Sequence, residues 1–100
     1  MVKHIVMWTL KKEAGGLTAK ENGAKMKEML EALNGRIDGL RSLMVSSDVV
    51  ASDPECHIVL VSEHDDAQAL DQYQVHPEHQ ACVAFIKGVV DSRRVLDFMM

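Results

Sequence analysis

Two segments of the chain show the two-residue period of β-strands, and both faces of each segment carry apolar side chains. In residues 2–11, one face would present Val2, His4, Val6, Trp8 and Leu10, and the other Lys3, Ile5, Met7 and Thr9. In residues 56–63, His57, Val59 and Val61 alternate with Ile58 and Leu60. An antiparallel sheet that is covered by helices on one face usually shows polar residues on the other. In a chain of 100 residues, the cover for the second face is best supplied by another copy of the same sheet. Ile5 and Ile58 are candidates for positions that face this partner.

The remaining patterns predict the element order β-α-β-β-α-β, which is the ferredoxin-like α+β fold. Thr18 and Glu21 form a capping-box pattern ahead of a helix that Asn34-Gly35 ends. A second strand is predicted over residues 40–50, and a short helix follows from residue 65 or 66 to residue 73. The His76-Pro77 pair separates that helix from another helical segment over 79–90, because proline lacks an amide donor. A last strand is predicted over 95–99, and the whole chain, residues 1–100, makes one domain.

Composition and charge exclude several classes of function. The formal net charge is −4 and no basic patch stands out, so nucleic acid and anionic membranes are not expected as partners. No apolar run has the length of a membrane span, and the N-terminal segment has no signal-peptide layout. Cys56 and Cys82 lie inside apolar patterns, which indicates buried free thiols in a reducing cytoplasm.

Four side chains could carry chemistry: His4, His57, Tyr73 and His79. His4 and His57 lie on apolar strand faces, where an imidazole needs a hydrogen-bond partner. Tyr73 and His79 flank the predicted helix break, which frees both to point into a common space. Imidazole titrates near neutral pH and a phenol can donate to an oxyanion, so the pair could act as an acid-base couple. The alternative for each of the four is a packed residue with its polar atoms satisfied locally. His64 is expected to be solvated.

Metal binding is a weaker hypothesis. His76 and His79 have a spacing that can bring two imidazoles together, but Pro77 distorts it. A third ligand would have to come from His57 or Glu78. Glycine-rich phosphate loops and Cys-x-x-Cys pairs are absent. We therefore expect neither a metal nor a cofactor.

Three segments of the chain resemble the stress-responsive A/B barrel domain (Dabb) family: Val2-Lys3-His4-Ile5-Val6, Tyr73-Gln74-Val75-His76-Pro77-Glu78-His79 and Val95-Leu96-Asp97-Phe98. The Tyr-x-x-His-Pro-x-His segment is the most specific of them. The resemblance implies a ferredoxin-like homodimer whose two sheets pack face to face into an α/β barrel. It also implies a pocket between sheet and helices in each subunit.

The family includes a plant polyketide cyclase, olivetolic acid cyclase, which closes a linear polyketide by aldol condensation without a cofactor. Its pocket pairs a histidine with a tyrosine and has two strand histidines nearby. The resemblance carries the pair onto His79 and Tyr73, and the two strand histidines onto His57 and His4. It thus implies these four as candidate catalytic residues.

Together these observations favour a homodimer that binds a small apolar or carbonyl-containing ligand. One alternative is a cofactor-independent cyclase or lyase, in which His79 removes a proton beside a carbonyl and Tyr73 stabilises the oxyanion. A more remote alternative is a haem-degrading monooxygenase, since similar dimeric barrels perform that chemistry. A purely structural dimer with a filled pocket is a further one.

Overall fold

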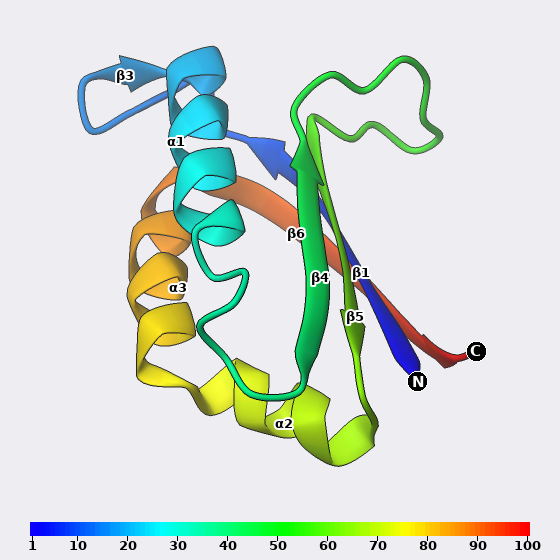
Figure 1. Ribbon diagram of the computed structural model, residues 1–100. Coiled ribbons are helices and arrows are strands. Elements are labelled where there is room, and N and C mark those ends of the chain that lie inside the picture. Colours follow the sequence, from blue (N-terminus) through cyan, green and yellow to red (C-terminus); the bar gives the residue numbers. More distant parts are fainter.

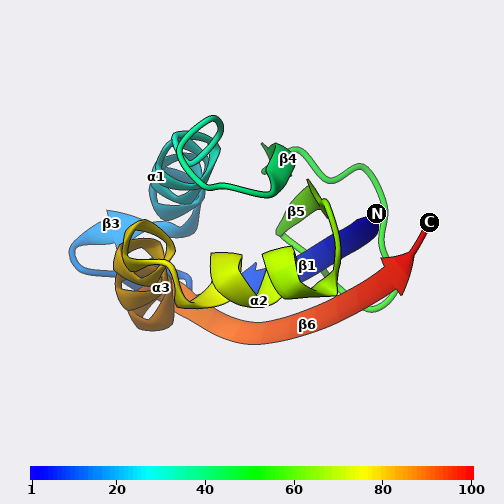
Figure 2. The same ribbon diagram turned by 60° about the horizontal axis from the view of Figure 1, so that its bottom comes forward.

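The computed structural model describes all 100 residues and shows one antiparallel sheet with helices on a single face (Figures 1 and 2). The strand order in this four-stranded sheet is β4-β5-β1-β6, which is the ferredoxin-like arrangement predicted from the sequence. Helices α1 and α3 lie side by side over the sheet, and α2 connects β5 to α3 at one end. The element bounds are β1 Val2–Leu10, β2 Glu13–Ala14, β3 Leu17–Thr18, α1 Ala19–Glu31, β4 Leu40–Ser46, β5 Ile58–His64, α2 Ala67–Val75, α3 Pro77–Val89 and β6 Val90–Met99.

Local signals in the sequence explain where the helices begin. The hydroxyl of Thr18 accepts from the amide of Glu21, and the Glu21 carboxylate accepts from the amide of Thr18, so the predicted capping box is confirmed. Pro77 occupies the first turn of α3, where its missing amide hydrogen is not needed. The ring Nδ1 of His76 accepts from the amide of Glu78 and caps the same helix. The predicted break at His76-Pro77 is therefore also confirmed.

Two predicted strand boundaries differ most from the structure. β4 ends at Ser46 and not near Val50, which lies fully exposed in the long β4–β5 loop. β6 begins at Val90, five residues before the predicted start, because its polar first half pairs with β1 and shows no apolar alternation. The short hairpin of β2 and β3 was not predicted. It turns at Gly15 and Gly16, both of which have positive φ angles, a conformation that glycine adopts without strain.

The sheet has one face buried against the helices and one open face. Alternate residues of β1 and β5 are buried beneath the helices, together with the apolar side of α1. Ile58 belongs to this core and is fully buried, so the assignment of Ile58 to a partner-facing position is wrong. Ile58 and Leu60 face the helices, whereas Val59 and Val61 lie on the open face. Ile5 does lie on the open face, beside Val61 and Leu96.

Two compositional expectations concern the helices and the cysteines. No helix in the structure combines the length and the apolar character that a membrane crossing requires. Both cysteines are free thiols; Cys82 is buried, whereas Cys56 is partly exposed.

Candidate functional site

A pocket of about 510 Å³ lies between the sheet and α3, and the first four residues of β6 help to line it. Its volume falls in the range of typical small-molecule sites. Eight of its 16 lining residues are hydrophobic, so it would accept a ligand with both apolar and polar parts. Three of the four candidate residues line it, namely His4, Tyr73 and His79.

His79 and Tyr73 are in direct contact at the pocket wall. Their ring centroids are 4.3 Å apart, and the ring planes are inclined by 42°. Nδ1 of His79 lies 3.1 Å from the backbone carbonyl oxygen of Gln74. A carbonyl only accepts, so Nδ1 carries the hydrogen and Nε2 is left as the acceptor. Burial lowers the pKa of His79, and the hydrogen bond to Gln74 opposes part of this shift. His4 and then Arg93 lower the pKa further, so the imidazole is neutral at physiological pH.

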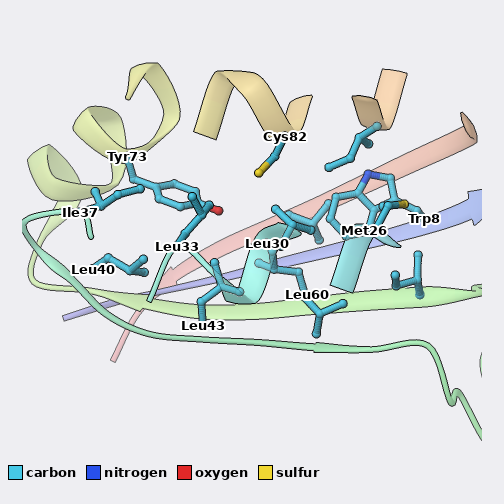
Figure 3. Close-up of a cluster of buried hydrophobic side chains, with 14 of the residues drawn as sticks. Trp8, Met26, Leu30, Leu33, Ile37, Leu40, Leu43, Leu60, Tyr73 and Cys82 are labelled. Atoms are coloured by element: carbon cyan, nitrogen blue, oxygen red, sulfur yellow. The ribbon is translucent and has the colours of Figure 1, made fainter. Parts of the chain in front are cut away.

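The Tyr73 hydroxyl is buried without a hydrogen-bond partner. Its side chain is only 1% exposed, and Figure 3 shows the hydroxyl pointing away from α2 into the interior. Burial raises the pKa of the phenol, so the group remains a protonated donor. The indole Nε1 of Trp8 is likewise buried and unpartnered. Both residues line the pocket, and their two buried donors lack acceptors within the chain.

His4 connects the pocket to the edge strand β6. Its Nδ1 hydrogen-bonds to a carboxylate oxygen of Asp97, directly across from it in the β1–β6 ladder. The carboxylate accepts this bond, which fixes the orientation of the His4 ring. The ring stands edge-on to Tyr73, with the centroids 6.2 Å apart. His4 is therefore a buried imidazole whose Nδ1 has a hydrogen-bond partner, and it forms part of the pocket wall.

His64 is a member of this cluster that the sequence reasoning missed. It is fully buried and lies 4.8 Å from the Tyr73 ring, so the expectation that it is solvated is wrong. Its Nε2 shares a hydrogen bond of 2.8 Å with Ser62, while its Nδ1 has no partner. Burial, followed by the neighbouring His4, lowers the pKa of His64 to about 4. The alternation of Ile58, Leu60, Ser62 and His64 on one strand face was the signal that could have revealed it.

His57 lies apart from the other candidates. It precedes β5, and its Nδ1 accepts from the amide of Leu10 at 2.9 Å. Its Nε2 donates to the carboxylate of Glu55 at 2.9 Å. The ring faces a separate hollow between α1 and the β4–β5 loop, and this hollow does not include Tyr73 or His79. No group of three or more histidine, cysteine, aspartate or glutamate side chains is placed to hold a metal ion.

The chain has clear relatives in sequence and structure. The family model described as the stress responsive A/B barrel domain (Dabb) matches residues 2–100. A dimeric protein of unknown function with a ferredoxin-like fold from Bacteroides fragilis is 28% identical, with a TM-score of 0.85, over 99% of this chain and 95% of that one. A Dabb family protein from Mesorhizobium loti is 20% identical, with a TM-score of 0.70, over 99% and 95% of the two chains.

A protein from Arabidopsis thaliana is 19% identical, with a TM-score of 0.83, over 100% of this chain and 95% of that one. None of the curated proteins matches the chain. The structural likenesses agree with the ferredoxin-like topology of the sheet, and the family match extends over nearly every residue. The chain therefore belongs to the stress-responsive A/B barrel domain family.

Proposed function

We propose that the chain forms a homodimer in which each subunit binds one small, partly apolar molecule that carries a carbonyl-type oxygen. The observation that carries this proposal is the pair of buried donors, Trp8 Nε1 and Tyr73 Oη, that have no partner within the chain. Leaving a buried donor unpaired costs about 1–3 kcal/mol, so such groups are uncommon without a role. Both residues line the pocket, so a ligand oxygen that reached either donor would give it an acceptor.

The homodimer is supported by the open face of the sheet. Met44, Leu96 and Phe98 are 55%, 53% and 41% exposed, although they are large and apolar. Exposed patches of this kind mark interaction surfaces. The Bacteroides fragilis relative is described as dimeric, and two copies packed through these faces would form the barrel.

We also propose that the protein is located in the cytoplasm. The free thiols of Cys56 and Cys82 fit the reducing conditions of that compartment.

We expect Tyr73→Phe to be more stable than the wild type and yet weaker in binding. The substitution keeps the ring and removes a buried, unpartnered hydroxyl, which should raise the free energy of unfolding by about 1 kcal/mol. Affinity for a medium-chain 2-alkanone should fall about tenfold, because the donor to its oxygen is lost. Urea unfolding measures the first effect. Fluorescence titration measures the second, since Trp8 is the only tryptophan and lines the pocket.

A less stable Tyr73→Phe protein with unchanged affinity would contradict the proposal. That result would show that the hydroxyl has a structural partner and does not meet the ligand. A wild-type protein that binds no member of a series of ketones of increasing length would contradict it as well.

A cofactor-independent cyclase or lyase activity is a second candidate, favoured by the fixed tautomer of His79. Its Nδ1 donates to Gln74, so Nε2 is free to take a proton from a carbon beside a carbonyl. The electron pair of the broken C–H bond would move to the carbonyl oxygen, and Tyr73 would donate to that developing oxyanion. The enolate carbon could then attack a second carbonyl of the same molecule. The alkoxide formed in that step would recover the proton.

We expect His79→Gln to slow proton exchange at the carbon beside the carbonyl of a bound ketone about a hundredfold. The exchange is measured in D₂O by NMR and requires no knowledge of the natural substrate. The wild-type rate should be constant at neutral pH and fall in acid, because the lowered pKa of His79 keeps its base form available at neutral pH.

His57→Gln is the matched control, because His57 faces a separate hollow. It should exchange at the wild-type rate. Equal rates for His79→Gln and the wild type would remove the catalytic candidate and leave the binding function standing.

A further inference from the structure

The charge of the pocket differs from that of the whole chain. The chain carries a formal net charge of −4, but the charged residues that line the pocket are Lys87, Arg93 and Asp91. Neither Lys87 nor Arg93 forms an ion pair within the chain, whereas Arg36 and Arg41 pair with Glu78 and Asp65. The pocket thus presents two unpaired cations against one carboxylate.

Arg93 is placed next to one of the unpartnered donors. It lies directly opposite Trp8 in the antiparallel β1–β6 ladder, so the two side chains project from the same face of the sheet. Both line the pocket, and the nitrogen of Trp8 has no acceptor. Arg93 is also near enough to His79 to disfavour its protonation. Arg93 and Trp8 therefore line the same cavity from neighbouring strand positions, and Tyr73 lines it as well.

We infer that the molecule bound in this pocket is a carboxylic acid, whose carboxylate is held by Arg93 and the Trp8 N–H. This inference rests on the proposed binding function and specifies its ligand class. An arginine fork matches the two oxygens of a carboxylate. The single excess positive charge at the pocket suits a singly charged acid better than a phosphate dianion, which Asp91 would repel more strongly. A second oxygen of the acid, such as a keto group, would meet the Tyr73 hydroxyl, and the apolar part would pack on Val83 and Ile86.

Matched acids and amides test the inference. Straight-chain carboxylates of about six to ten carbons suit the pocket volume, and each has a primary amide of nearly the same shape. At neutral pH and low salt, the wild type should bind each carboxylate about tenfold more tightly than its amide, judged by Trp8 fluorescence. Arg93→Gln should abolish that difference. Arg36→Gln removes the same charge from a site outside the pocket, so this variant should keep the tenfold preference for the carboxylate.

A second readout distinguishes a bound carboxylate from a structural role of Arg93. A carboxylate beside Arg93 should raise the pKa of His79 towards its ordinary value, because it offsets the positive charge that disfavours the imidazolium. A histidine NMR titration at saturating carboxylate should show this rise, and the matched amide should not produce it.

The failure of this inference can be told apart from the failure of the binding function. If amide and carboxylate bind equally and Tyr73→Phe weakens both, the ligand is not an acid but the pocket still binds a carbonyl compound. If Arg36→Gln lowers carboxylate affinity as much as Arg93→Gln, the preference reflects the overall charge of the protein and the inference is wrong. If no member of either series binds, both proposals are wrong.

Discussion

Val61→Asp is expected to yield a folded monomer. Val61 lies near the centre of the open sheet face, with Ile5 and Met44 as its neighbours on the adjacent strands. In the proposed dimer this position is covered by the partner's sheet, so the substitution would bury one uncompensated carboxylate from each subunit. Each of the two charges costs about 3–5 kcal/mol, so together they raise the dissociation constant at least about ten-thousandfold. The fold of the subunit should survive, because no helix packs on this face and the monomer leaves the side chain partly exposed.

Light scattering at micromolar concentration measures the result. Val75→Asp is the matched control, because Val75 is 72% exposed at the end of α2, in the helical layer on the opposite side of the sheet. It should remain dimeric. A dimeric Val61→Asp protein, or a wild type that is already monomeric at this concentration, would contradict the face-to-face barrel. Circular dichroism of each variant establishes that loss of the dimer is not loss of the fold.

The fold could be predicted because its signals are local. Two-sided apolar alternation identified β1, the capping box placed the start of α1, and His76-Pro77 separated α2 from α3. The errors occurred where tertiary pairing decides the structure. The first half of β6 has the sequence Val90-Asp91-Ser92-Arg93-Arg94, which has no apolar period, and it forms a strand because β1 offers it a hydrogen-bonding edge.

The site was only partly predictable for the same reason. Tyr73 and His79 flank one helix break, so their contact follows from a short segment. The roles of His64 and Arg93 depend on strands that are far apart in sequence. His64 was misassigned as a solvated residue just beyond the predicted strand over 56–63, although the phase of β5 directs it inwards. His57 shares an apolar stretch with Val59, but it precedes the strand and is satisfied by Leu10 and Glu55.

His64 should make the protein markedly less stable in mild acid. The pKa of His64 is about 4 in the folded state and about 6.5 when the chain is unfolded, so the unfolded state binds more protons between these values. Stability is therefore fully present above about pH 6.5 and decreases as the pH falls towards 4. The difference in pKa corresponds to about 3 kcal/mol, a large share of the stability of a small domain. In His64→Gln this contribution is absent, so the free energy of unfolding should decrease less on acidification.

Urea unfolding at about pH 7.5 and pH 4.5, at one protein concentration, measures how far the free energy of unfolding decreases in the wild type and in His64→Gln. Subtracting one decrease from the other removes the contribution of the other titrating groups. If His64→Gln proves too unstable, an NMR titration of the wild type decides the matter, since His64 should remain neutral down to about pH 5. Equal decreases for the two proteins, or a His64 that titrates near pH 6.5, would mean that the fold compensates this buried charge.

A neutral His64 has a consequence for the site as well. It lies against Tyr73, and Tyr73 lies against His79, so a positive charge on His64 would further disfavour protonation of the proposed base. With His64 neutral at physiological pH, His79 could accept a proton from a ligand without that repulsion.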